Sequence, residues 1–284
     1  MATFATADQL LVVIDPVALR TDGESVRIAK DVLSAGAAST KMCLPEDPEE
    51  FARALARRGS RRPVVIGDDR ALLRAVSLLH RRRELAGCAL SMVPVGGSLS
   101  LARSLGVPIG AVAAARAVLE GAERRLDLLV DDSDGVVLGA LRIPPLTPRA
   151  DPEEAEEESA RPWLRTCQSL VRTLVPPRPS RAAPAPPAPG HSRLRVEVDG
   201  DTLVDLDQPV EAVSVVPGGS GSAAVEVRPL SVGAEAAPLL ARGRRVTVSG
   251  ADFRYRADSA VSGPVRRRTW TVWEGALRLT LPSG

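Results

Sequence analysis

Two loops between residues 64 and 103 have residue types that bind phosphate groups. Each follows an apolar run and precedes a plausible helix, and their sequences are Val64-Val65-Ile66-Gly67-Asp68-Asp69-Arg70 and Pro94-Val95-Gly96-Gly97-Ser98-Leu99-Ser100-Leu101-Ala102-Arg103. In open α/β sheets such segments present backbone N–H groups to anions, and glycine lets a phosphate approach the backbone. Two such loops indicate a nucleotide site, with Gly67, Asp68, Gly96 and Gly97 as candidate contacts.

The segments around these loops predict alternating strands and helices. A short continuous apolar run at residues 10–14 is typical of a strand buried on both faces of a parallel sheet. Further strands are predicted at residues 40–44, 64–66 and 90–93. Apolar residues at helical spacing predict helices at 24–33, 49–58, 71–83, near 100–105 and at 112–119. A β-hairpin is expected between 126–130 and 135–143, across a turn that ends in Asp134-Gly135.

The composition changes after residue 145, which predicts a linker and a second domain. Residues 146–191 contain an acidic run, an amphipathic segment from Trp163 to Val175 and a Pro/Ala-rich tract. The amphipathic segment could dock on a membrane interface or pack against its own domain. From residue 192 the chain alternates in short strand-like runs at 193–198, 212–216, 224–228, 245–248, 253–257, 269–273 and 277–281. We therefore expect an α/β nucleotide-binding domain at 1–145 and an all-β sandwich domain at 192–284.

Composition excludes several functional classes. Aromatic residues make up 2% of the 284 residues, which leaves almost no material for the stacking platform of a nucleic-acid binder. The formal net charge is +2, but arginines cluster at 57–58, 61–62, 81–83, 242–245 and 266–268. Such clusters suit phosphates or anionic lipid, although solvated charge at helix ends and edge strands is the favoured explanation.

The remaining sequence features indicate a cytoplasmic protein. Cys43, Cys88 and Cys167 lack the spacing of a metal site, which fits a reducing compartment. The first residues lack the pattern of a signal peptide, and no apolar run reaches the ~20 residues of a spanning helix. His80 and His191 lie too far apart in the sequence to suggest a metal pair or a triad. Gly218-Gly219-Ser220-Gly221 follows a proline between two strands, which favours a flexible hairpin.

The order of these pieces resembles the diacylglycerol kinase family of lipid kinases. That family has a first loop of Gly-Gly-Asp-Gly-Thr, which falls on residues 66–70 here, and a second of roughly Pro-Leu-Gly-Thr-Gly-Asn-Asp-Phe-Ala-Arg, which falls on 94–103. The ending Gly275-Ala276-Leu277-Arg278-Leu279-Thr280-Leu281-Pro282 also matches the family's last strands. The resemblance implies the NAD kinase/diacylglycerol kinase-like fold with a C-terminal β-domain.

The resemblance also implies an activity, its cofactors and its residues. By family, the chain would phosphorylate a lipid hydroxyl such as that of diacylglycerol, using ATP and Mg²⁺. The lipid substrate would be reached at the inner membrane surface. Asp68 would organise the metal and phosphate, and Gly67, Gly96 and Gly97 would supply backbone contacts. Asp258, in the turn before the final strands, would accept the hydroxyl proton. The alternatives are a helix N-cap for Asp68 and an exposed turn residue for Asp258.

Several substitutions depart from the family pattern. Asp15 stands where the family has asparagine, and Asp69 and Arg70 replace glycine and threonine. A second carboxylate beside phosphate adds repulsion of roughly 1 kcal/mol at 4 Å in water and several times that in a drier site; Mg²⁺ or an inward-turned Arg70 would offset it. A pseudokinase that binds lipid or protein is therefore an equal alternative, and a soluble nucleotide or sugar kinase is a third.

Overall fold

The N-terminal part of the chain folds around a parallel β-sheet. The computed structural model describes residues 9–145, 192–230 and 237–283. The parallel strands are β1 (Gln9–Ile14), β2 (Ser39–Cys43), β3 (Arg62–Gly67) and β4 (Ala89–Pro94). They lie in the order β4-β3-β1-β2, with β1 paired in parallel to both β2 and β3. The four predicted strands are therefore confirmed.

Aspartate caps begin most of the helices that flank this sheet. The helices are α1 (Pro16–Thr21), α2 (Gly23–Gly36), α3 (Pro48–Ala56), α4 (Asp69–Arg81), α5 (Ser100–Ser104) and α6 (Ala111–Glu120). Asp15, Asp22, Asp47 and Asp68 each accept a hydrogen bond from a backbone N–H in the first turn that follows. Helix α1 was not predicted.

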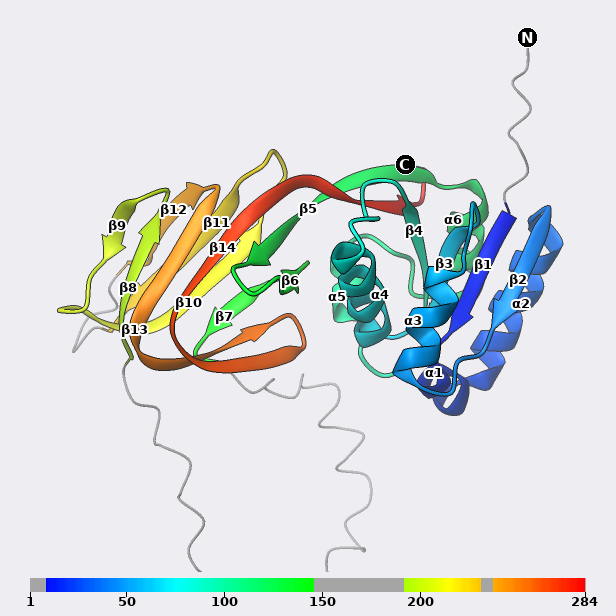
Figure 1. Ribbon diagram of the computed structural model, residues 1–284, viewed down its shortest axis with the longest axis horizontal. Helices are drawn as coiled ribbons and strands as arrows, with labels where there is room; N and C mark the ends of the chain where they lie inside the picture. Colours follow the sequence, from blue (N-terminus) through cyan, green and yellow to red (C-terminus); the bar gives the residue numbers. More distant parts are fainter. Residues whose placement is uncertain (1–8, 146–191, 231–236, 284) are drawn as a thin grey trace, which may run out of the picture.

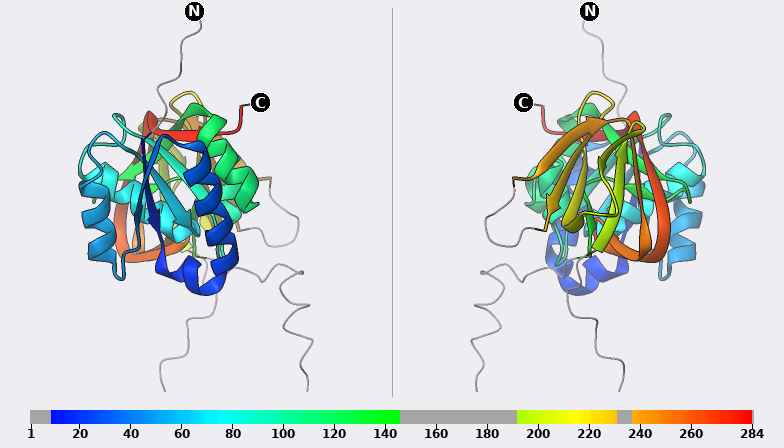
Figure 2. Two further views of the ribbon diagram at one scale, coloured as in Figure 1. Left: turned by 90° about the vertical axis from the view of Figure 1, so that its right-hand side faces the viewer. Right: turned by 90° about the vertical axis from the view of Figure 1, so that its left-hand side faces the viewer.

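Helices cover both faces of the parallel sheet (Figure 2, left). Alternate residues of β1 point to opposite faces: Leu10, Val12 and Ile14 join one buried cluster with residues of α1, α2 and α6. Leu11 and Val13 join another cluster with residues of α3, α4 and α5. All five side chains are at most 1% exposed, as expected for a strand buried on both faces.

The described chain after α6 is rich in β-strands (Figure 1). Its strands are β5 (Ala122–Asp131), β6 (Val136–Val137), β7 (Leu141–Ile143), β8 (Ser192–Val198), β9 (Asp201–Val204), β10 (Pro209–Pro217), β11 (Ala223–Pro229), β12 (Leu239–Gly243), β13 (Arg245–Ala257) and β14 (Ala260–Leu281). One antiparallel run is β12-β11-β10-β7, and another joins β9, β8, β13, β14 and β5. Strand β13 also pairs with β7, and β10 with β8, so the two runs share one apolar core.

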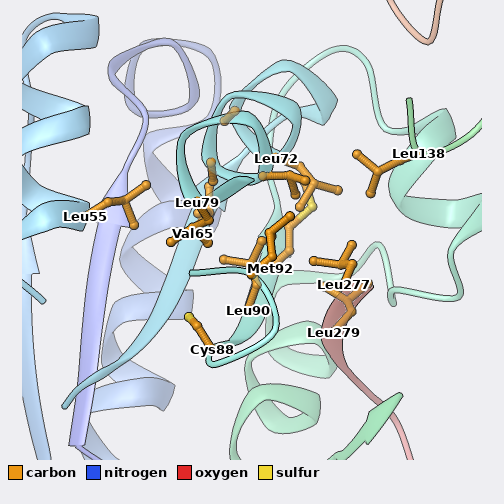
Figure 3. Close-up of a cluster of buried hydrophobic side chains, with 14 of the residues drawn as sticks. Leu55, Val65, Leu72, Leu79, Cys88, Leu90, Met92, Leu138, Leu277 and Leu279 are labelled. Carbon is orange, nitrogen blue, oxygen red and sulfur yellow. The ribbon is translucent and has the colours of Figure 1, made fainter. Parts of the chain in front are cut away.

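The long strand β14 connects this β-rich region to the parallel sheet. Its last part pairs in parallel with β4, where Leu279 lies opposite Leu90, and antiparallel with β5. Figure 3 shows Leu277 and Leu279 packed with Leu72 of α4 and Met92 of β4. Residues near the end of the chain therefore complete the core that residues 9–130 begin.

One predicted element is wrong, and some lie outside the described residues. The second strand of the expected hairpin is broken: only Val136 and Val137 pair with β5, whereas β7 pairs with β10 and β13. The break falls where the N–H groups of Gly139 and Ala140 turn to the carboxylate of Asp258. The expected strands at 245–248 and 253–257 are one strand, β13. The Trp163 to Val175 segment and the linker lie outside the described residues.

Candidate functional site at the carboxyl edge of the parallel sheet

Three loops meet where the parallel strands end. The Asp15 N–H donates to the Ile66 carbonyl at 2.8 Å, and the Val95 N–H donates to the Gly67 carbonyl at 2.9 Å. The Asp69 N–H donates to the Ser98 carbonyl at 2.9 Å. The carboxyl edge of an open α/β sheet is the usual place for a ligand, and the structure brings the two predicted loops together there.

The three candidate glycines have different surroundings. A Cβ on Gly67 would lie 2.6 Å from the Ala71 Cβ and 3.0 Å from the Asp15 Cβ, so packing requires this glycine. Gly96 has a φ of +131°, and its missing Cβ would lie 3.1 Å from the Asp68 Cβ. Gly97 is exposed and has no atom within 4 Å of the position of a Cβ. Of the three, Gly97 leaves the most open space beside its backbone.

Asp68 caps helix α4 with one oxygen of its carboxylate, and its other carboxylate oxygen takes no part in the cap. Its Oδ1 accepts hydrogen bonds from the N–H groups of Arg70 and Ala71 at 3.0 and 3.1 Å. The expected N-cap is therefore present. Within the part of the chain that the structure describes, the Oδ2 of this half-buried side chain accepts no hydrogen bond. This oxygen is free to meet a cation.

Asp69 joins the two loops. Its carboxylate is 2% exposed, and it accepts from the Leu101 N–H at 2.9 Å through Oδ2 and from the Ala102 N–H at 2.9 Å through Oδ1. The hydroxyls of Ser98 and Ser100 donate longer bonds to Oδ2, at 3.3 and 3.4 Å. Arg70 is exposed, so of the two ways to offset this charge the inward turn of the arginine does not occur.

Asp15 is neutralised by an arginine. This carboxylate is 3% exposed, and it accepts from the Val17 N–H and from Arg74 Nη1, both at 2.8 Å. The Arg74 guanidinium also lies over the Phe51 ring, 5.5 Å from its centroid. The acid that replaces the family's asparagine is therefore held by α4 and directed away from free solution.

Asp258 comes from the distant β13–β14 turn and reaches the same region. It has a φ of +51°, and its carboxylate accepts from the N–H groups of Leu138, Gly139 and Ala140 at 2.7 to 3.0 Å. Burial raises the pKa of this carboxyl, the three backbone hydrogen bonds lower it, and the charge of Asp69 raises it; the net pKa is raised. The half-buried Asp258 is thus not the exposed turn residue of the alternative interpretation.

The surroundings of Gly139 show how close Asp258 lies to the second loop. A Cβ at Gly139 would be 2.8 Å from Leu101 Cδ1 and 3.0 Å from Asp258 Oδ1. The side chains of Asp258 and of Leu101 in α5 therefore both lie next to this glycine. Because Leu101 also donates its N–H to Asp69, the structure gathers the two loops and the predicted base at one place.

The carboxylates offer little for a protein-only metal site. Within residues 9–145, 192–230 and 237–283, no group of three or more His, Cys, Asp or Glu side chains could hold a metal ion. Asp68 Oδ2 fits a different case, in which Mg²⁺ is held by one or two carboxylates, water and the phosphates of a nucleotide. Asp68 would be the ligand from this chain, and the metal would neutralise phosphate charge.

Sequence reasoning missed two contacts of the site. It treated Asp69 only as a source of repulsion, although the hydroxyl-rich sequence Ser98-Leu99-Ser100 offered donors to a nearby acid. Arg74 was not singled out, and it lies a little more than one helical turn after Arg70.

His80 bonds Asp134 at 2.8 Å and packs on Trp273, away from these loops.

The arginine clusters are used in different ways. Arg266 and Arg268 form ion pairs with Asp252 and Asp132. Arg244, Arg245 and Arg267 line a hollow of about 470 Å³ on the β-rich region.

Comparison with known proteins tests the resemblance to the diacylglycerol kinase family. The family described as "Diacylglycerol kinase catalytic domain" matches residues 9–130, which contain both loops. The resemblance to the diacylglycerol kinase family is confirmed. No curated protein sequence matches the chain. None of the helices described is long and apolar enough to cross a membrane.

Solved structures extend the similarity to the C-terminal region. A structure described as "A putative diacylglycerol kinase from Bacillus anthracis str. Sterne" superposes with a TM-score of 0.69 at 13% identity, covering 98% of each chain. Another, described as a diacylglycerol kinase from the same organism, gives 0.69 at 12% identity with the same coverage. At this identity the likeness shows the fold, including the β-rich C-terminal region.

Proposed function

We propose that this chain is a lipid kinase-like phosphotransferase that transfers the γ-phosphoryl group of ATP to a lipid hydroxyl such as that of diacylglycerol. The observation that carries the proposal is the position of Asp258. Asp258 follows Asp68 by about 190 positions in the sequence, yet it lies beside the second loop. Asp68 lies at the same edge of the sheet, directly after β3. Phosphoryl transfer requires phosphate donors, a metal ligand and a base near the acceptor. The proximity of the candidate residues for these three roles supports the proposal.

Each residue has a role that its geometry allows. The backbone at Gly96 and Gly97 would contact phosphate, with Gly67 keeping the first loop close to Asp15. Asp68 Oδ2 would hold Mg²⁺. Asp258 Oδ2 accepts a single hydrogen bond, from Leu138, so it retains capacity to accept the proton of the lipid hydroxyl. A raised pKa makes this carboxylate a stronger base than an ordinary aspartate.

A pseudokinase is the second candidate, and one observation favours it. The N–H groups of Leu101 and Ala102 in the second loop already bond the Asp69 carboxylate, so they are not available to a phosphate. A fold of this kind that does not bind nucleotide would serve as a lipid- or protein-binding module. The two candidates differ in whether MgATP binds and whether lipid is phosphorylated.

The test measures both properties in the purified protein. Thermal unfolding with millimolar MgATP should show a rise in Tm, because a ligand at 100 times its Kd adds about 2.7 kcal/mol of stability. Asp68→Ala should abolish the rise. Transfer of labelled phosphate from ATP to diacylglycerol in mixed micelles should fall about 10²- to 10⁴-fold in Asp258→Asn, with MgATP binding retained.

Asp252→Asn is the matched control for the loss of a carboxylate, because Asp252 lies on β13 but is exposed and paired with Arg266. It should leave phosphate transfer within twofold of the wild type. Absence of lipid phosphorylation by the wild type at saturating MgATP would contradict the kinase proposal and favour the pseudokinase.

A further inference from the structure

The carboxylate of Asp69 is an anion that already belongs to the second loop. It is 2% exposed, and the ion pairs among the described residues include none to it. Burying a charge without a partner cation is costly unless hydrogen bonds replace the lost water. Here two backbone N–H groups and two serine hydroxyls supply those bonds, at 2.9 to 3.4 Å.

Helix α5 depends on this contact for its first turn. The residue at its N-cap position, Leu99, makes no side-chain cap bond. The N–H groups of Leu101 and Ala102 would otherwise be left without an acceptor in a buried position. Asp69 is the first residue of α4, and its side chain caps the neighbouring helix α5.

The backbone of Asp69 strengthens the same connection. Its N–H donates to the Ser98 carbonyl at 2.9 Å, so one residue holds the second loop at residues 98, 101 and 102. The loops are therefore fastened to each other by the residue that replaces a glycine in the first loop. A glycine at this position could form the backbone bond but none of the four bonds to the carboxylate.

We infer that Asp69 is an internal latch, which holds the second loop closed on the first and lowers the affinity of this loop pair for MgATP. Two effects act together. The carboxylate occupies the N–H groups of Leu101 and Ala102, so they cannot donate to a phosphate. Its negative charge, on a residue that is 2% exposed, also repels phosphates that enter the loop pair. This inference rests on the proposed nucleotide site, but it holds whether or not the bound nucleotide is then used for phosphoryl transfer.

The latch is tested by replacing Asp69 and measuring MgATP binding directly. Asp69→Gly, which restores the family's residue, should lower the Kd for MgATP at least tenfold in isothermal titration. Hydrogen exchange at the Leu101 and Ala102 amides should speed up in the free variant and slow down again when MgATP is added. The second readout reports the loop itself and does not depend on activity.

Asp47→Gly is the matched control, because Asp47 caps α3 through the Glu50 N–H and takes no part in the loops. It should destabilise the protein without changing the Kd for MgATP. Should Asp69→Gly not fold, Asp69→Asn keeps the shape of the side chain and removes its charge, and it should lower the Kd as well.

The outcomes separate the latch from the proposed function. Tighter MgATP binding in the folded variant, without lipid phosphorylation in any variant, would support the latch and reject the kinase. Lipid phosphorylation by the wild type with a Kd unchanged by Asp69→Gly or Asp69→Asn would support the kinase and reject the latch. In that case Asp69 would be only a structural cap for α5.

Discussion

Gly67 and Gly97 both belong to the candidate phosphate loops, but only Gly67 is required by packing. We expect Gly67→Ala to lower the free energy of unfolding by about 1–3 kcal/mol, since its Cβ would press on the buried Ala71 and on Asp15. Gly97→Ala, with open space and an ordinary φ, should change stability by less than about 0.5 kcal/mol.

Urea unfolding of the two variants measures this difference in stability. Titration with MgATP measures the affinity of each variant for the nucleotide. If the backbone at Gly97 approaches phosphate, Gly97→Ala should weaken MgATP binding even though it leaves stability unchanged. Equal stabilities of the Gly67 and Gly97 variants would show that the loop around Gly67 can shift to accept a methyl group.

At the scale of elements, α4 is fixed at its start by charges that only the fold brings together. Asp15 at the end of β1 and Arg74 in α4 form an ion pair whose carboxylate is buried and whose guanidinium is about one-third exposed. Removing the exposed partner leaves a buried charge, whereas removing the buried charge leaves an arginine that water can reach. The two substitutions should therefore have unequal effects.

We expect Arg74→Ala to lower the free energy of unfolding by about 2–4 kcal/mol, including the lost contact with Phe51. Asp15→Asn should cost about 1 kcal/mol, because Asn still accepts from the Val17 N–H. Urea unfolding at pH 7 gives both values. A larger loss for Asp15→Asn than for Arg74→Ala would reject this account of the pair.

The elements were more predictable than the contacts between them. Continuous apolar runs identified β1 and β3, because strands buried on both faces need no polar residues. The break between β6 and β7 could not be predicted, since its cause is Asp258, more than 100 residues further along the chain. For the same reason the sequence suggested Asp68 and Asp258 only by resemblance, and it gave no sign that Asp69 bonds Leu101 and Ala102.

At the scale of the whole molecule, β14 makes the two regions depend on each other. Leu277, Leu279 and Leu281 lie in the core beside the parallel sheet, whereas Trp270 of the same strand lies in the core of the β-rich region. The Ser91 and Thr280 hydroxyls, both buried, also bond each other at 2.9 Å. The expected division into domains at 1–145 and 192–284 stays a prediction, but neither part alone contains all the residues of its core.

This dependence predicts a single cooperative unfolding transition. Leu279→Ala, at a position that is 0% exposed, should lower the free energy of unfolding by about 2–5 kcal/mol. Hydrogen exchange in increasing denaturant should then show amides of β3 and of β11 losing protection together, both at lower denaturant than in the wild type. Val261→Ala, on the same strand but with a half-exposed side chain, is the control and should change stability by less than about 0.5 kcal/mol. Loss of protection in β3 alone would mean that the β-rich region is stable by itself and that β14 joins two independent folding units.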